Sequence, residues 1–413
     1  MNMDAPIVVG IDIGTTKICT LVARIESENS FRILGVGIEP ARGVKKGTVV
    51  DIAAASQAIG RSIEKAQRTS GLEITSALVS MAGSHVTSVN SRGVVGISGR
   101  VIDQNDLYRA MDAARAISIP HNREIIHILQ RGFMIDGQEG IRMPIGMHGY
   151  RLEVEAHIIT ASAATIENLR KCVLSAGVEV SQFVLNPLAS GEVVLSETER
   201  QMGAIVCDIG GGTTNMAIYI DGNVWHTCVV SLGGNHITSD IAHGLRLSIP
   251  QAEELKIKYG VAIRNSIESS DVFSIRAFGE DRPIQISRSD LALIIEARIE
   301  EIFDLILQEI KRSGYDGLLP AGMILTGGTS KLPEIKNLAS DVLGIPVRTA
   351  QPEGMIGLVD QLHSPAYSTS VGLLHWALQM SEATSEPKKK SPGFNSPRIN
   401  WESIGDFLKR LLP

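Results

Sequence analysis

The sequence predicts an α/β protein of two related lobes, with a small domain inserted into the first lobe. Three observations support this fold class: a strand–turn–strand motif that occurs twice, a segment of different composition between the copies, and long helical stretches after the second copy. The 413 residues, 44% hydrophobic and 20% charged, suffice for two to four domain-sized units with substantial cores.

The repeated motif is a pair of apolar strands joined by a glycine- and threonine-rich turn. In the first copy, residues 7–13 and 18–25 predict the strands and Gly14-Thr15-Thr16-Lys17 predicts the turn. The second copy spans residues 204–220, and its turn consists of Gly210, Gly211, Gly212, Thr213, Thr214 and Asn215. Both copies contain Asp-Ile-Gly followed by Thr-Thr, and this internal repeat indicates two related lobes.

These turns have the chemistry of a phosphate site. A glycine at a hairpin tip lets backbone N–H groups approach phosphate oxygens, and threonine hydroxyls add donors. Asp12 and Asp208, just upstream of the glycines, can hold Mg²⁺ through its water shell. One such motif is usually a plain hairpin turn, whereas two copies about 196 positions apart can clamp phosphates from opposite sides.

Three further pieces fit a nucleotide site. Gly327-Gly328 can leave room for a nucleoside, Gly233-Gly234 supplies a second glycine pair, and Glu253 and Lys256 share one face of a predicted helix. We expect Glu253 to bind a ribose hydroxyl and Lys256 to lie beside the base; the alternative is an ordinary surface ion pair. The sequence contains no P-loop motif, and no G-x-G-x-x-G follows a strand.

Residues 85–160, between the two hairpins, differ from them in composition and pattern. They predict a small strand–helix–strand–strand domain. Short strands are expected within 85–100, a capped helix at 103–117, and strands at 124–135 and 150–159. After the second hairpin, Ser248 and Ser289 are expected to cap helices that run to about Tyr259 and Arg312. A strand at 323–325 and a last helix at 367–380 complete the predicted body.

The composition excludes several classes of protein. The net charge of −6 argues against a basic nucleic-acid-binding protein, and we expect no nucleic-acid partner. No apolar run reaches the ~18 residues that span a bilayer, and the N-terminus lacks the pattern of a secretory signal. The cysteines, which are expected to be reduced and buried, are Cys19, Cys172, Cys207 and Cys228.

The nucleotide pieces, in this order, resemble the superfamily of actin, the DnaK-type chaperones and hexokinase. That resemblance covers residues 7–84 and about 160–380. It implies two lobes with ATP and Mg²⁺ in the cleft between them. A DnaK-type chaperone would also need a substrate-binding domain, for which the 33 residues after Met380 are too few.

Several runs of residues make a more specific resemblance. They are Asp106-Leu107-x-Arg109-Ala110, Phe133-x-x-Asp136-Gly137, Arg151-Leu152-Glu153-Val154-Glu155 and Gly233-Gly234-x-His236-Ile237-Thr238. These runs resemble the FtsA family of actin-like bacterial division proteins, and the resemblance extends over nearly the whole chain. It implies that the inserted segment is an SHS2-type domain. The family pattern has an acidic residue at position 235, where this chain has Asn235. This difference weakens the assignment of position 235 as a ribose-binding residue.

The resemblance also implies a function and a division into domains. The family binds ATP, polymerises, and tethers filaments of tubulin-like FtsZ to the cytoplasmic face of the cell membrane at the division site. Its inserted domain contacts other protomers and later division proteins, and a subdomain at about residues 235–300 receives the C-terminal peptide of FtsZ. The expected boundaries are 1–84, 160–190 and 365–380 for the first lobe, 85–160 for the SHS2-type domain, 191–364 for the second lobe, 381–399 for a disordered linker and 400–413 for a tail helix.

One departure from the superfamily bears on hydrolysis. In chaperone and MreB relatives, a glutamate directly before a proline in the first interlobe helix orients the attacking water. The matching residue here is Asn186, before Pro187. A neutral amide cannot act as a general base, so we expect slow ATP hydrolysis at most and assign no catalytic residue.

The last 14 residues predict an amphipathic helix that binds a membrane surface. At 100° per residue, its apolar side chains fall within one arc of ~140°: Trp401, Ile404, Phe407, Leu408, Leu411 and Leu412. The preceding linker, with three prolines and Lys388-Lys389-Lys390, favours a mobile tail that binds lipid over a helix packed on the body. Two other functions stay open: a PilM-like pilus-assembly scaffold, which needs no lipid-binding tail, and an ATP-dependent small-molecule kinase.

The tail prediction can be tested with a charge placed in the apolar stripe. Leu408→Glu should remove most binding to anionic liposomes, because burying a side chain of this kind contributes up to roughly 1.5–3 kcal/mol. Glu402→Gln changes the opposite, polar side of the helix and serves as the matched control. Sedimentation with liposomes measures both. If the Leu408→Glu protein sediments as the wild type does, the anchor lies elsewhere.

Overall fold

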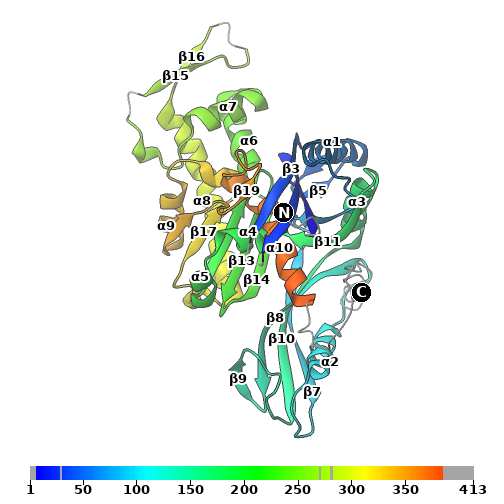
Figure 1. Cartoon of the computed structure of the whole chain (residues 1–413). Helices are drawn as coiled ribbons and strands as arrows, with labels where there is room; N and C mark the ends of the chain where they lie inside the picture. The colour runs from blue at the N-terminus through cyan, green and yellow to red at the C-terminus, as the bar shows by residue number, and fades with distance from the viewer. Residues whose placement is uncertain (1–5, 28–29, 269–270, 280–281, 385–413) are drawn as a thin grey trace.

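The computed structural model describes residues 6–27, 30–268, 271–279 and 282–384. Two mixed sheets form the two lobes, and a third sheet forms a domain that projects away from them (Figure 1). The predicted tail helix at 400–413 lies outside the described residues, as does the predicted linker from residue 385 onward.

The first lobe contains a six-stranded sheet with the order β11-β6-β1-β2-β3-β19. Its strands are β1 (Ile7–Ile13), β2 (Lys17–Ser27), β3 (Ser30–Pro40), β6 (Ser76–Met81), β11 (Glu179–Leu185) and β19 (Ile356–Gly357). β1, β2 and β3 form an antiparallel meander, and β6 and β11 run parallel beside β1. The two short strands β4 (Val44–Lys45) and β5 (Thr48–Val49) pair separately.

Helices cover both faces of this sheet. α1 (Ile52–Ser70) and α3 (Ala163–Leu174) pack on the face that carries Ile18 and Val22, and α10 (Ser368–Thr384) packs on the face that carries Cys19 and Leu21. Because side chains alternate along a strand and both faces are covered, β2 is apolar at successive positions. α10 ends four residues beyond the predicted end at Met380.

The second lobe contains a five-stranded sheet with the order β14-β13-β12-β17-β18. Its strands are β12 (Ala204–Ile209), β13 (Thr214–Ile220), β14 (Asn223–Val230), β17 (Met323–Thr326) and β18 (Val347–Thr349). The repeated hairpin is therefore confirmed as β1–β2 in one lobe and β12–β13 in the other. α4 (Asn186–Val194) lies between the two sheets, where Leu188 packs on the second sheet and Ala189 on α10.

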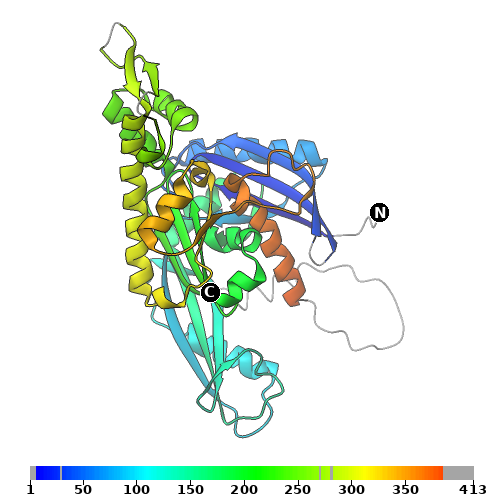
Figure 2. The same cartoon turned by 90° about the vertical axis from the view of Figure 1, so that its left-hand side faces the viewer.

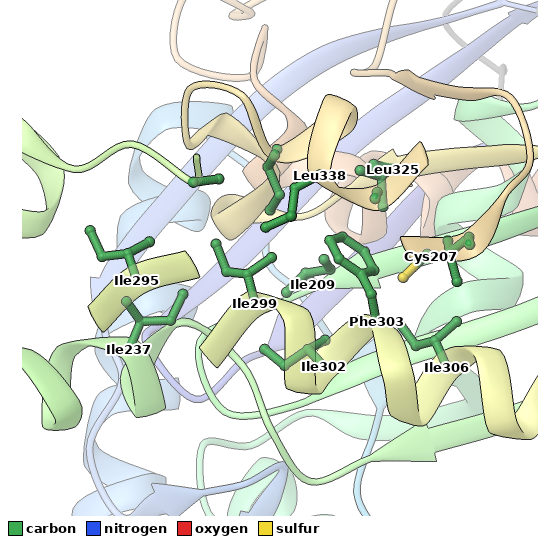
Figure 3. Close-up of a cluster of buried hydrophobic side chains, with 14 of the residues drawn as sticks. Cys207, Ile209, Ile237, Ile295, Ile299, Ile302, Phe303, Ile306, Leu325 and Leu338 are labelled. Atoms are coloured by element: carbon green, nitrogen blue, oxygen red, sulfur yellow. The ribbon is translucent and has the colours of Figure 1, made fainter. Parts of the chain in front are cut away.

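The core of the second lobe lies between its sheet and the long helix α8 (Arg288–Ser313), as Figure 3 shows. Apolar residues recur at helical spacing along α8, so that Phe303 and Ile306 point toward Cys207 on the sheet and Ile299 lies beside Ile209. α6 (Gly234–Leu245) and α9 (Ile335–Leu343) pack beside α8.

The helix caps in the second lobe are partly as predicted. Ser248 caps α7 (Ile249–Tyr259), as expected. The cap of α8 is Ser287, whose hydroxyl accepts a hydrogen bond from the Ser289 backbone N–H, so the predicted cap at Ser289 is wrong by two residues. Two serines two positions apart offer the same local signal, and the strand that precedes α8 decides between them. The remaining elements of this lobe are α5 (Glu197–Met202), β15 (Val272–Ile275) and β16 (Ile284–Ser287).

The inserted segment contains a four-stranded sheet with one helix. Its elements are β7 (Thr87–Gly96), α2 (Gln104–Arg115), β8 (Arg123–Ile135), β9 (Gln138–Ile141) and β10 (Arg151–Ser162), with the strand order β7-β10-β8-β9. The predicted helix and the two later strands are confirmed. The segment 85–100 contains one strand, β7, where several short strands were expected, and β9 was not predicted. In Figure 1 and Figure 2, this domain lies at the end of the molecule opposite the β15–β16 hairpin.

The inserted domain contacts the second lobe as well as the first, to which its chain is joined. The guanidinium of Arg131 on β8 lies 4.3 Å from the ring centre of Trp225, and its Nη2 donates to the Tyr315 hydroxyl at 3.1 Å. His157 on β10 bridges Asn90 and Thr227 through its two ring nitrogens, at 2.7 and 3.0 Å. These contacts cover β14, the edge strand of the second sheet.

The buried His157 predicts a loss of stability in mild acid. Burial lowers the pKa of His157 to about 3. Between about pH 6.5 and pH 3, the ring is therefore protonated in the unfolded chain but stays neutral in the folded chain. Stability contributed by the neutral ring is therefore lost as the pH falls from 7 to 5, by roughly 2 kcal/mol. His157→Gln should reduce that loss in denaturant titrations at the two pH values. His121→Gln, at an exposed position, is the control, and an equal loss in both variants would contradict the prediction.

Candidate functional site

The two repeated hairpins close with the same backbone hydrogen bond. The Gly14 N–H donates to the Lys17 carbonyl at 3.0 Å, and the Gly210 N–H donates to the Thr213 carbonyl at 2.9 Å. Lys17 is the first residue of β2, so the predicted four-residue turn is one residue too long. The repeat in sequence is thus a repeat in local geometry, one copy in each lobe.

The tips of the two hairpins face each other across the boundary between the lobes. A Cβ atom on Gly212 would stand 2.6 Å from the Thr15 hydroxyl, and one on Gly211 would collide with the Thr16 hydroxyl. Any larger residue at these positions would force the opposing threonine side chains to move. The structure therefore brings together the two turns that the sequence places far apart.

Two buried carboxylates lie behind these tips, one from each lobe. Asp12 accepts hydrogen bonds from the Ser80 hydroxyl at 2.8 Å and from the Ser370 hydroxyl at 2.7 Å. Asp208 accepts one from the Thr369 hydroxyl at 2.7 Å. Both side chains were predicted as Mg²⁺ ligands, and both are almost completely buried.

The electrostatic environment penalises charge on Asp208. Burial raises the pKa of Asp208 to about 6; the Thr369 hydroxyl opposes this shift, the Asp12 carboxylate adds to it, and Lys17 opposes it. The Lys17 ammonium donates to the Ala366 carbonyl and lies 4.7 Å from the centre of the Tyr367 ring. A divalent cation at this point would offset the repulsion between the two carboxylates.

The glycine pairs predicted for the site make close backbone approaches around the second hairpin. A Cβ on Gly233 would stand 2.6 Å from the Gly210 carbonyl, and the Gly234 N–H donates to that carbonyl at 2.9 Å. Gly327 has a φ of +86°, and a Cβ there would collide with Asp208. Gly328 has more room, since its nearest neighbour, the Ala366 Cβ, would be 3.7 Å away.

The Glu253–Lys256 pair lies beside Gly234, where the nucleotide prediction needs it. The two charged groups are 2.6 Å apart, and the Lys256 ammonium also donates to the Gly234 carbonyl at 3.1 Å and to the Thr238 hydroxyl at 2.9 Å. Only 13% of the Lys256 side chain is exposed, which rules out a purely solvated surface pair.

The remaining predicted residues of the second turn are buried. Thr214 donates to the Leu232 carbonyl at 2.9 Å, so its hydroxyl serves the fold, and Thr213 lies next to Asn215. The side-chain oxygens of Asn215 and Asn186 are buried without a hydrogen-bond partner. Such orphaned acceptors are uncommon in folded proteins and point to a ligand or water at these positions.

Sequence reasoning missed the three hydroxyl residues that hold the carboxylates. Ser80 lies at the end of a strand, and Thr369 and Ser370 lie in the first turn of α10. A run such as Ser368-Thr369-Ser370 resembles an ordinary helix start. Nothing local indicates a partner 161 or 358 positions away.

Within the described part of the chain, no cluster of three or more His, Cys, Asp or Glu residues could enclose a metal ion. The two aspartates alone are a donor set suited to Mg²⁺, which keeps most of its waters and typically binds one or two carboxylates plus phosphates. Among the described residues no helix is both long and apolar enough to cross a bilayer.

Comparisons with known proteins identify relatives over nearly the whole chain. The family model described as "Cell division protein FtsA" matches residues 205–372, and the model "SHS2 domain inserted in FTSA" matches residues 83–160. The chain is 42% identical to the cell division protein FtsA of Pseudomonas aeruginosa over 90% of its own length and 89% of the relative's. It is 39% identical to that of Neisseria meningitidis, with 97% and 96% covered, and 32% identical to that of Escherichia coli, with 99% and 97% covered.

Solved structures of lower identity share the fold. A PilM–PilN type IV pilus biogenesis complex matches with a TM-score of 0.64 at 17% identity, covering 90% of this chain and 98% of the other. MreB5 of Spiroplasma citri bound to AMPPNP matches with a TM-score of 0.57 at 13% identity, covering 91% and 97%. The predicted two-lobed actin-like fold with an inserted SHS2-type domain is thereby confirmed.

Asp208→Asn should stabilise the nucleotide-free protein at neutral pH. Because burial raises the pKa of Asp208 to about 6, its ionised form destabilises the fold increasingly as the pH rises from about 4 to 6 and fully above that range. The asparagine removes this cost, which we put at up to about 3 kcal/mol at pH 7.5, and the advantage should shrink toward pH 4. Denaturant titrations at pH 7.5 and 4.5 test this. A variant that is equally destabilised at both pH values would refute it.

Proposed function

Because this chain belongs to the FtsA family of cell division proteins, we propose that it is an ATP-binding, polymerising adaptor that tethers FtsZ filaments to the cytoplasmic face of the membrane. The observation that carries the nucleotide part is the meeting of two equivalent hairpins, one from each lobe, with Asp12 and Asp208 buried behind their tips. Two phosphate-binding turns that face each other suit a ligand with several phosphates.

We assign the proposed roles residue by residue. The hairpin backbones around Gly14 and Gly210–Gly212, with Thr15 and Thr16, would bind the phosphates, and Asp12 and Asp208 would bind hydrated Mg²⁺. Lys17, next to the carboxylates, would bind a phosphate oxygen. Glu253 and Lys256 would contact the nucleoside, for which Gly328 leaves space. Bound Mg²⁺ would neutralise charge that the buried aspartates and the phosphates bring together.

Hydrolysis in this proposal is slow. Asn186 opens α4 with its side-chain oxygen buried and unpartnered, beside the boundary between the lobes. Its amide can orient a water molecule but cannot take its proton. ATP then acts mainly as a structural ligand that controls assembly.

The adaptor role needs surfaces for a filament partner and a membrane. We propose that the subdomain at about residues 235–300 binds the C-terminal peptide of FtsZ; it exposes large apolar side chains at Ile249, Ile257 and Phe278. The tail at 400–413 would bind lipid weakly as one copy and strongly when a polymer presents many copies. The inserted SHS2 domain would contact other protomers and later division proteins.

Family membership favours this function over the two alternatives. The likeness to the PilM–PilN complex is at 17% identity and concerns the fold alone. The relatives that cover nearly the whole chain are cell division proteins, which favours the adaptor over a small-molecule kinase.

Sedimentation with anionic liposomes, Mg²⁺–ATP and FtsZ tests the adaptor role. FtsZ should sediment with liposomes only when the full-length protein is present, and severalfold less when residues 400–413 are removed, because the tether then lacks its membrane end. FtsZ without its C-terminal peptide is the matched control and should stay in solution. Equal recovery of FtsZ with the truncated protein would contradict the proposal.

A further inference from the structure

Three consecutive buried hydroxyl side chains open α10, and each has a different partner. The Ser368 hydroxyl lies 2.6 Å from that of Thr326, whereas Thr369 donates to Asp208 and Ser370 donates to Asp12, each at 2.7 Å. One helical turn therefore contacts the carboxylates of both lobes at once.

Helix geometry explains how neighbouring residues reach opposite lobes. Successive side chains on an α-helix diverge by about 100°, so Thr369 and Ser370 point in different directions from one turn. The positive end of the helix dipole also lies at this turn and favours nearby negative charge. The same helix packs its apolar residues Val371 and Leu374 into the first lobe, which fixes the position of the turn.

We propose that Thr369 and Ser370 are positioning residues that align Asp208 and Asp12, so that the two lobes share one hydrated Mg²⁺ and nucleotide affinity depends on that ion. This inference rests on the proposed nucleotide function. A hydroxyl that donates to an ionised carboxylate forms a charge-assisted hydrogen bond, which is shorter and stronger than a neutral one. Each carboxylate oxygen retains a further lone pair for the waters of the ion.

Other contacts leave Thr369 as the main side chain that holds Asp208. Asp12 has a second hydroxyl donor in Ser80, so it stays partly held when Ser370 is changed. Among the residues that the structure describes, only the Thr369 side chain donates a hydrogen bond to the Asp208 carboxylate, whose other oxygen faces Gly327. The effect of losing Thr369 should therefore exceed the effect of losing Ser370.

Ser368 provides a matched control. It lies in the same turn, is equally buried, and its hydroxyl bonds to a neutral partner, Thr326. Ser368→Ala thus removes a buried hydrogen bond of α10 without touching either carboxylate. If Ser368→Ala and Thr369→Val lose the same amount of ATP affinity, that loss is caused by destabilisation of the helix.

The test compares ATP affinity with Mg²⁺ and with EDTA, by calorimetry, in full-length proteins whose melting curves confirm folding. Thr369→Val, which replaces the hydroxyl by a methyl group, should reduce the Mg²⁺-dependent gain in affinity about tenfold, and Ser370→Ala should reduce it less. Thr369→Ser keeps the hydroxyl and should preserve the gain, as should Ser368→Ala.

Two outcomes would overturn the inference, and they differ in what else they affect. If the wild type gains affinity with Mg²⁺ and Thr369→Val keeps that gain, or if Ser368→Ala loses it equally, the hydroxyls only support the fold. If the wild type gains no ATP affinity from Mg²⁺ over EDTA, the shared Mg²⁺ and the inference fail; if it binds ATP under neither condition, the proposed nucleotide site fails as well. Should Thr369→Val not fold, Ser370→Ala decides by the same ratio, since it removes the other hydroxyl: a Mg²⁺-dependent gain equal to that of the wild type would overturn the inference.

Discussion

Two carboxylates from different lobes, Asp12 and Asp208, are buried near each other. Several elements of the structure supply the donors and the positive charge that offset the cost of burying them. Burying like charges together is costly unless donors or cations offset them. Asp12 and Asp208 obtain hydroxyl donors from β6 and from the first turn of α10, with the Lys17 ammonium close by. A strand, a helix and two hairpins, distant in sequence, therefore converge on the same place.

The close approach of the hairpins imposes a second constraint, on side-chain size. Gly211 and Gly212 oppose the hydroxyls of Thr16 and Thr15, and Gly327 opposes Asp208. The tertiary structure gives the steric reason for these glycines: a Cβ at any of them would collide with a threonine side chain or with a carboxylate. The proposed phosphate and metal ligands and the contact between the lobes thus involve the same residues.

The inserted domain extends these contacts toward the far end of the molecule. It is joined to the first lobe by the chain and held to the second by Arg131 and His157. Thr227, which contacts His157, pairs across the sheet with Ala217 on β13, the strand that leaves the second hairpin. A change in the relative position of the lobes must therefore move or strain the inserted domain. A device of this kind suits a protein whose proposed polymerisation responds to ATP.

The sequence by itself determined the features that depend on local patterns. The repeated hairpin, the two aspartates, the helix cap at Ser248 and the strand–helix–strand–strand order follow from residues near one another in the chain, where periodicity, turn chemistry and capping act. The tertiary structure alone decided which hydroxyls hold Asp12 and Asp208, that Lys256 is mostly buried, and that Arg131 lies between Trp225 and Tyr315. Those contacts join positions up to 358 residues apart, and no local preference specifies a partner at that distance.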